Sequence, residues 1–302
     1  MFQKIKDPGF GEKYTVKTKR LINVDGSFNV TRFGSKRSLR DVFQLLINLS
    51  WIRFSFLLIV FYFLINLFFA SLYYFLSPHG LNGTDKNISY FFNAFFFSVQ
   101  TFSSVGYGKI YPEGLMSNAI SSVESLVGLV SYAIVTGILY GRFSRPKARI
   151  LFSKNALISP YKDGLSLQFR IANKRSTQLM DIEAKAILML NGENNNRQYF
   201  NLKLEPSRIH FFPLSWTIVH PIEKDGPFDN VDADFLNKME GEILVLIRGF
   251  DETFSQEVHA RSSYLLSDIV CNAKFKSMFD VDVNGETLLY MNKIDDFDLL
   301  DE

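Results

Sequence analysis

The chain has 302 residues, 47% of them hydrophobic, and a formal net charge of +2. This near-neutral balance argues against a nucleic-acid partner. The single cysteine, Cys271, excludes a disulfide framework and suits a reducing compartment. The long apolar runs are too few for a membrane bundle over the whole chain, and the roughly 150 residues after Arg149 have the usual size of one soluble domain.

The segment before the first long apolar run has two parts. Residues 1–34 are polar, and the turn signal Asp25-Gly26 between two short apolar stretches predicts one edge hairpin or strand. Residues 37–51 place polar and apolar side chains on opposite sides of a helix, with Phe43, Leu46 and Ile47 on the apolar side. This pattern predicts an interfacial helix lying on the membrane surface. The alternative is an ordinary amphipathic core helix.

Three apolar segments follow. Residues 52–76 carry one charge, Arg53, and exceed the ~20 residues that a spanning helix needs. Residues 90–102 are equally apolar but too short to span, which predicts a re-entrant pore helix. Residues 115–143 predict a second spanning helix. The predicted divisions are therefore an N-terminal segment at 1–51, a transmembrane pore domain at 52–143 and a cytoplasmic domain at 144–302.

The five residues after the pore helix carry the main functional signal: Ser104, Val105, Gly106, Tyr107 and Gly108. A potassium ion leaves water only if a ring of oxygens replaces its hydration shell, and glycines let backbone carbonyls point the same way. The stretch is close to the TVGYG loop that does this in potassium channels. It predicts a selectivity filter that binds K⁺ at the first four of these residues. A glycine-rich turn is the alternative, which the long apolar flanks disfavour.

The filter prediction has a consequence for assembly. Non-helical backbone at membrane depth is tolerated only beside protein or a water-filled cavity. One loop cannot surround an ion, and filters of this kind use four. We therefore expect a homotetramer, with potassium as the conducted ion and no cofactor.

Basic residues near the membrane predict the orientation. They are numerous before the first spanning helix and after the second, and sparse between the two. Both termini are therefore expected in the cytoplasm, in a multi-pass protein of the cell membrane, and no removable signal peptide is expected before residue 50. The residues counted are Lys36, Arg37, Arg40 and Arg53 before, Arg142, Arg145, Lys147 and Arg149 after, and Lys86 and Lys109 between.

The last half of the chain indicates strands. Short alternating or β-rich runs are separated by clusters of Gly, Asn, Asp and Pro, which is typical of an antiparallel sandwich. The acidic tail, 294–302, is expected to be frayed. The predicted strands are 165–172, 183–190, 198–204, 242–248 and 253–260.

The second spanning helix carries candidate pore residues. Glu124 lies at membrane depth, where a charge is costly enough to indicate function. Two placements stay open for it: contact with the end of the pore helix, for example Ser103, or exposure to the cavity. The residues that step by four from Gly128 share a ridge and predict an apolar inner gate that closes by dewetting, against the alternative of packing between helices. They are Gly128, Tyr132, Thr136 and Tyr140.

The basic residues at the two membrane exits have two compatible interpretations. They act as a positive-inside stop, and they also form a site for anionic lipid headgroups, at ~1 kcal/mol for each basic side chain. Ala148 interrupts the basic run, so neither the affinity nor the sign of a lipid effect follows. The candidate lipid-binding residues are Arg37, Arg40, Arg142, Arg145, Lys147 and Arg149.

Several segments, in order, resemble the inward-rectifier potassium channels, and more closely their prokaryotic branch, the KirBac channels. The resemblance covers nearly the whole chain. The matching segments are RLINVDGSFNVTR (20–32), SVQTFSSVGYGKIYP (98–112), GRFSRPKARILFS (141–153), LQFRIANKR (167–175), SWTIVHPI (215–222) and EILVLIRGFDETFSQEVHARSSY (242–264).

The resemblance implies an immunoglobulin-like cytoplasmic domain, four copies of which extend the pore. It also implies an inner gate at Tyr132 and Tyr140, and an exit segment that couples lipid headgroups to the gate. The chain departs from the family at Gln100, where many members have a glutamate that braces the filter by a salt bridge, and at Cys271, where a tryptophan is expected. An enzyme is disfavoured because the histidines are isolated. The remaining rival is a membrane-anchored, non-conducting scaffold or binding protein.

Overall fold

The computed structural model describes residues 4–13, 20–34, 39–144, 148–174, 179–192, 196–224, 226–229, 236 and 239–300, with the backbone alone at 39–41. The chain divides into two compact units. One is helical and runs from Gly34 to Arg145, and the other joins residues 1–33 to residues 146–302.

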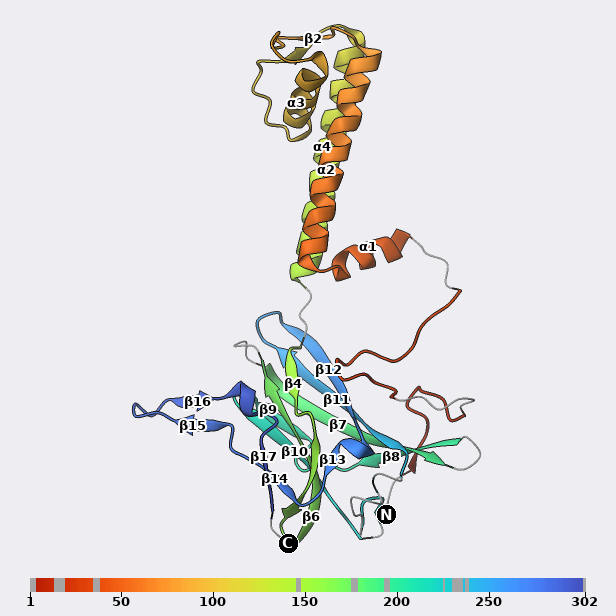
Figure 1. Ribbon diagram of the computed structural model, residues 1–302, viewed down its shortest axis with the longest axis vertical. Coiled ribbons are helices and arrows are strands. Elements are labelled where there is room, and N and C mark those ends of the chain that lie inside the picture. Colours follow the sequence, from red (N-terminus) through yellow and green to blue (C-terminus); the bar gives the residue numbers. More distant parts are fainter. Residues whose placement is uncertain are drawn as a thin grey trace. The chain divides into compact units, whose positions relative to one another are not determined.

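Within the residues that the structure describes, the helical unit contains four helices, each in the region of a predicted element (Figure 1). The short strands β2 (Leu81–Asn82) and β3 (Tyr111–Pro112) pair between them. Two of the helices are long and apolar enough to cross a membrane, which confirms the predicted spans. The helices are α1 (Leu39–Asn48), α2 (Trp51–Leu76), α3 (Tyr90–Phe102) and α4 (Leu115–Phe143).

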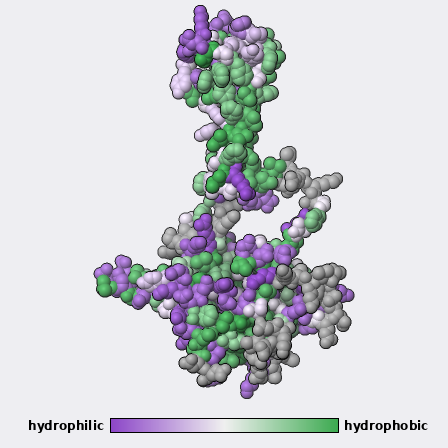
Figure 2. Space-filling view, viewed as in Figure 1, coloured by the Kyte–Doolittle hydropathy of each residue, from purple (hydrophilic) through white to green (hydrophobic). Residues whose placement is uncertain are grey.

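Small residues let the three longer helices approach closely. Ala70 of α2 and Ala94 of α3 are completely buried, and the rings of Tyr73 and Phe97 pack edge to face with centroids 5.3 Å apart. Much of the outer surface of α2 is apolar and exposed, as the green side chains over this unit in Figure 2 show. Such a surface suits lipid, since a helix that is apolar all round is either buried or spans a membrane.

The helix α1 is shorter than the predicted segment 37–51. Its ten residues end at Asn48, and a new helix begins at Trp51 after Ser50 adopts an extended conformation. Ile47 is buried close to Gly141 of α4, whereas Val42 and Leu45 keep about half of their surface exposed. The exposed apolar residues fit the interfacial helix expected from the sequence. Residues 35–38 lie outside the described part.

The second unit is a sandwich of two sheets, which confirms the predicted fold class. In the first sheet, β11 lies between β7 and β12, all antiparallel. The first sheet has the order β1 (Lys4–Ile5), β8 (Asn196–Leu202), β7 (Leu179–Gly192), β11 (Gly241–Asp251) and β12 (Gln256–Leu265), with β9 (Arg208–Phe211) also on β7. The second has the order β10 (Ser215–Pro221), β6 (Gly164–Asn173), β5 (Ala156–Tyr161) and β13 (Ile269–Val270), with β4 (Ile150–Phe152) on β6.

Alternating side chains of the two sheets form the core. Along β7, Ile182, Ala184, Ala186 and Leu188 point inward and are at most 2% exposed. They pack with side chains of the opposite sheet such as Phe169. Cys271 packs against the edge of this core.

The N-terminal segment packs on this domain. Ile22 bridges to Phe28 around the Asp25-Gly26 turn, in line with the predicted hairpin or strand. The carboxylate of Glu242 in β11 accepts hydrogen bonds from the backbone N–H groups of Leu21 (2.7 Å) and Ile22 (3.2 Å). A buried side chain thus holds a segment more than two hundred residues away in sequence.

The predicted frayed tail is wrong for residues 297–299. They form β17 (Phe297–Leu299), which pairs with β14 (Ala273–Phe275), and Asp298 makes a salt bridge of 2.7 Å to Lys276. The alternation Phe-Asp-Leu provides a strand pattern within the acidic composition. A separate hairpin joins β15 (Phe279–Val281) to β16 (Thr287–Leu289).

Candidate ion-conduction site

The backbone of the loop after α3 alternates between positive and ordinary φ. The dihedral φ is positive at Ser104 (58°), Gly106 (53°) and Gly108 (78°), alternating with residues of ordinary φ. Positive φ is available to glycine without strain and is uncommon for other residues. Val105 and Tyr107 lie between them.

Hydrogen bonds anchor the start of this loop to the end of the pore helix. The N–H groups of Val105 (3.0 Å) and Gly106 (3.3 Å) both donate to the carbonyl oxygen of Gln100. Within the described part of the chain, the carbonyl oxygens of Val105, Gly106 and Tyr107 accept no hydrogen bond from the protein. They are therefore available to coordinate a cation.

Of the two placements left open for Glu124, the structure shows contact with the pore helix and not exposure to a cavity, but at Ser98 and not at Ser103. The side chain of Glu124 is completely buried in one protomer. The hydroxyl of Tyr73 in α2 donates to Oε2 (2.7 Å), and the Oγ of Ser98 in α3 makes a short hydrogen bond to Oε1. The side chain points into the junction of three helices, so its partner lies more than a turn before the end of the pore helix.

Gly128 is also buried, unlike the later members of its ridge. A Cβ at this position would lie 2.2 Å from the carbonyl oxygen of Phe102. The glycine therefore lets α4 touch the backbone at the end of the pore helix, and it does not present a side chain to the cavity. This close approach places α4 directly against the base of the filter loop.

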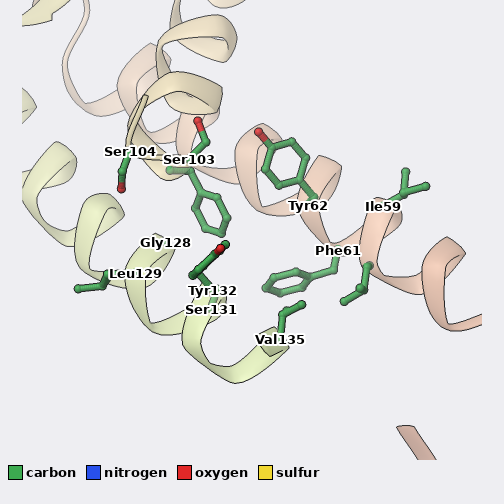
Figure 3. A pocket seen from close by; sticks show the side chains of 12 residues that line it. Ile59, Phe61, Tyr62, Ser103, Ser104, Gly128, Leu129, Ser131, Tyr132 and Val135 are labelled. Atoms are coloured by element: carbon green, nitrogen blue, oxygen red, sulfur yellow. The ribbon is translucent and has the colours of Figure 1, made fainter. Parts of the chain in front are cut away.

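The other ridge residues are exposed on α4. Tyr132 and Tyr140 are 76% and 74% exposed in one protomer, and Thr136 is exposed beside them. Tyr132 lines a pocket between α2 and α4 with a volume of about 620 Å³. Figure 3 shows it there together with Tyr62 and Ser104. The lining is mostly apolar.

Arg142 is engaged within its own protomer. Its guanidinium donates to three carbonyl oxygens at the end of α1, those of Leu46 (2.5 Å), Ile47 (3.0 Å) and Leu49 (2.8 Å). It also lies over the ring of Trp51, 4.5 Å from the centroid. These bonds to the end of α1 compete with the predicted lipid-binding role of Arg142, which stays a prediction.

Of the other candidate lipid-binding residues, the structure describes the side chain of one. Arg149 is exposed. Arg37, Arg145 and Lys147 lie outside the described residues, as does the side chain of Arg40.

The sequence interpretation missed the polar partners of Glu124. Asn66, Tyr73 and Ser98 are completely buried with it. Asn66 carried a usable signal, because an amide in the middle of a long apolar helix is costly unless it is paired. A serine and a tyrosine among aromatic residues give no comparable signal.

The two spanning helices, the re-entrant α3 and the loop with free carbonyls define a pore-forming membrane protein with a β-sandwich domain. Comparison with known families agrees. Residues 57–145 match the model described as "Ion channel", and residues 150–300 match the "Inward rectifier potassium channel C-terminal domain". The chain belongs to the inward rectifier potassium channel family.

The sequence similarity to individual relatives extends over most of the chain. It is 33% identical to the inward rectifier potassium channel Kirbac3.1 of Paramagnetospirillum magnetotacticum over 94% of this chain and 97% of that protein. It is 26% identical to the G protein-activated inward rectifier potassium channel 2 of Mus musculus, over 89% of this chain and 71% of that protein. The match to the mouse G protein-activated inward rectifier potassium channel 4 is also 26%, over 82% and 66%. This family consists of ion channels.

Proposed function

We propose that the chain forms a homotetrameric channel that conducts K⁺ passively through Ser104, Val105, Gly106, Tyr107 and Gly108. The observation that carries the proposal is the loop after α3, with positive φ at both glycines and three carbonyls free of protein partners. The family membership supports potassium as the ion. Four copies are needed because one loop cannot replace the hydration shell of an ion.

The exposed residues of α4 form the gate in this proposal. Tyr132 and Tyr140 are large and largely exposed in one protomer, and Thr136 lies between them. Four such rings around an axis make an apolar constriction that stops ion flow when water leaves it.

Anionic lipid controls this gate from the cytoplasmic side, where both termini lie. The exposed apolar residues of α1 and the basic residues after α4 support the proposal, since both features favour the headgroup layer. Arg145, Lys147 and Arg149 are the main candidates, with Arg37 and Arg40 from the other exit. Arg142 is left out because it caps α1.

Ion flux into liposomes tests the function. The purified protein is expected to pass potassium and rubidium and to exclude sodium. Gly106→Ala is expected to abolish the flux, because its φ of 53° is strained for any residue with a Cβ. Gly164→Ala is the matched control, since Gly164 is exposed at the start of β6 with open space around its Cβ position. Equal sodium and potassium flux would refute the filter, and a protein without flux would favour the membrane-anchored scaffold.

A further inference from the structure

Four buried polar side chains form a cluster at the junction of α2, α3 and α4. Asn66, Tyr73, Ser98 and Glu124 each have no exposed surface. We call these four residues the support cluster. They bring the only acidic side chain of α4 into contact with the pore helix, at a position that the channel function as proposed above does not use.

The amide of Asn66 has a defined orientation. Its Nδ2 donates to the backbone carbonyl of Tyr62 (2.7 Å). The reversed amide would place two oxygens at that distance, and neither could donate. The other amide atom, Oδ1, therefore faces Ser98, whose Oγ lies 3.1 Å away. Because an amide oxygen only accepts, Ser98 must donate to it.

The number of protons available for these hydrogen bonds then determines whether the carboxyl group of Glu124 is protonated. The hydroxyl of Ser98 carries one proton, which Asn66 Oδ1 requires. The same Oγ makes a short hydrogen bond to Oε1 of Glu124, so this second bond has a donor only if Oε1 carries a proton. The other carboxyl oxygen, Oε2, accepts from the hydroxyl of Tyr73 (2.7 Å). Every member of the support cluster is satisfied when the acid is neutral.

If Glu124 were ionised, the support cluster would contain two unfavourable features. Ser98 would donate to Glu124, and Asn66 Oδ1 would face a hydroxyl oxygen without a proton between them, in a site with no access to water. The carboxylate would also be buried without a cation, since no salt bridge within the described residues involves Glu124. An unpaired buried charge costs far more than a neutral acid. A carboxylic acid held neutral in an apolar site can instead act as a hydrogen-bond donor.

We propose that Glu124 is a neutral positioning residue, whose O–H donates to Ser98 and fixes the pore helix that carries the filter. Ser98 lies two residues before Gln100, whose carbonyl anchors the N–H groups of Val105 and Gly106. The neutral Gln100 cannot brace the filter by charge, so the brace comes from α4. This inference rests on the proposed function of the filter loop.

Two substitutions at Glu124 test whether this residue acts as a hydrogen-bond donor or as a negative charge. In Glu124→Gln the amide N–H₂ donates to Ser98 and the amide oxygen accepts from Tyr73, so selective potassium flux is expected to stay within about twofold of the native value. Glu124→Ala removes the acceptor of the Tyr73 hydroxyl and the bond between α4 and Ser98, which keeps only Asn66 as its partner, and is expected to lower flux by about tenfold or more. If the glutamine variant loses as much flux as the alanine variant, the acid acts as a charge and the proposal is wrong.

Infrared spectroscopy tests the proton directly and needs no ion flux. The native full-length protein at neutral pH is expected to show the carbonyl stretch of a protonated carboxylic acid. The band should vanish in Glu124→Gln and persist in Glu113→Gln, because Glu113 is an exposed carboxylate. Tyr73→Phe should move the band to higher frequency, because Oε2 loses its donor.

Absence of the band in the native protein would overturn the proposal, whatever the flux result. A native protein that shows the band but passes sodium and potassium equally would instead refute the filter. The two failures are therefore distinguishable.

Discussion

Gly128 shows how one residue without a side chain positions the filter. A Cβ there would meet the backbone of Phe102, which cannot move aside as a flexible side chain can. Glu124 sits one turn earlier on α4 and contacts the same pore helix through Ser98. At the residue scale, therefore, α4 holds the pore helix by one close backbone contact and one buried hydrogen bond.

We expect Gly128→Ala to be destabilising by about 1–3 kcal/mol, the usual cost of overpacking a tight interface. Thermal unfolding of the detergent-solubilised protein measures this, and potassium flux in liposomes should fall with it. Gly137→Ala is the matched control on the same helix, because nothing lies within 4 Å of its Cβ position. Equal effects of the two substitutions would show that the contact with Phe102 is unimportant.

In the proposed channel, we expect Tyr132 to set the response of the pore to polyvalent cations. A carboxylate ring facing a cavity attracts such blockers in a poorly screened space, whereas a phenol ring narrows the path without a charge. Because Glu124 is buried away from the cavity, it cannot replace that ring. We predict only modest voltage-dependent block by cytoplasmic spermine, and stronger block in Tyr132→Asp. Recordings that show steep block in the native channel, or no gain with the aspartate, would place the blocker elsewhere.

At the scale of elements, Arg142 joins the end of α1 to the end of α4. The guanidinium of Arg142 donates from two nitrogens held in a planar fork, Nη1 to Leu46 and Ile47 and Nη2 to Leu49, whereas a lysine carries all its donors on a single nitrogen. The carbonyls belong to the last turn of α1 and the residue that follows it, where no helical partner exists. Movement of α4 at this level must therefore move α1 or break these bonds.

Arg142→Lys is expected to loosen α1 although the charge is kept. Hydrogen exchange measured by mass spectrometry should show faster exchange of the α1 amides, with little change in α3. Arg149→Lys serves as control, because Arg149 is exposed and has no comparable role. Unchanged protection of α1 in Arg142→Lys would mean that the charge alone, or packing on Trp51, holds the helix.

At the scale of the whole molecule, the helical unit and the β-sandwich differ in the surface that they expose. The helical unit exposes apolar residues that suit lipid (Figure 2). The β-sandwich buries its own apolar core. We therefore expect lipid to act on the basic residues at the membrane exits, and pH to act on the stability of the β-sandwich through its buried titratable groups.

We expect Arg145→Gln and Lys147→Gln to weaken the response of flux to anionic lipid. Each basic side chain at a charged surface contributes about 1 kcal/mol, and four copies multiply the effect. Flux in liposomes with a graded anionic fraction is the measurement. Lys162→Gln is the control, since Lys162 lies in the turn between β5 and β6. Identical flux in neutral and anionic liposomes would contradict lipid control.

His220 gives the β-sandwich a pH dependence. Burial lowers its pKa, because desolvation penalises the imidazolium, and the hydrogen bond to the carbonyl of Lys203 (2.8 Å) offsets this only in part. The unfolded chain therefore binds the proton more tightly than the folded one. The stability is full above about pH 6.5, the ordinary histidine pKa, and is lost as the pH falls below it.

Chemical unfolding of the full chain between pH 7.5 and 5 should therefore show a falling free energy of unfolding. His220→Gln should flatten that slope, and His259→Gln should leave it unchanged because His259 is exposed. A slope that is the same in both variants would assign the pH dependence to other groups.

Local patterns were sufficient for the membrane elements. The span of α2, the short α3 and the filter loop follow from length, apolarity and glycine spacing, which constrain the backbone over a few neighbouring residues. Five sandwich strands, β6, β7, β8, β11 and β12, followed from alternation in the same way, with ends that shifted by a few residues, whereas strands such as β5 and β10 were not predicted. The partners of individual side chains did not follow. Glu124 bonds to Ser98 and not to Ser103, Arg142 caps a helix almost a hundred residues earlier, and the acidic tail forms β17 by pairing with β14. Periodicity says which face of an element is buried, but only the packed structure decides which atoms of distant segments lie within hydrogen-bonding distance.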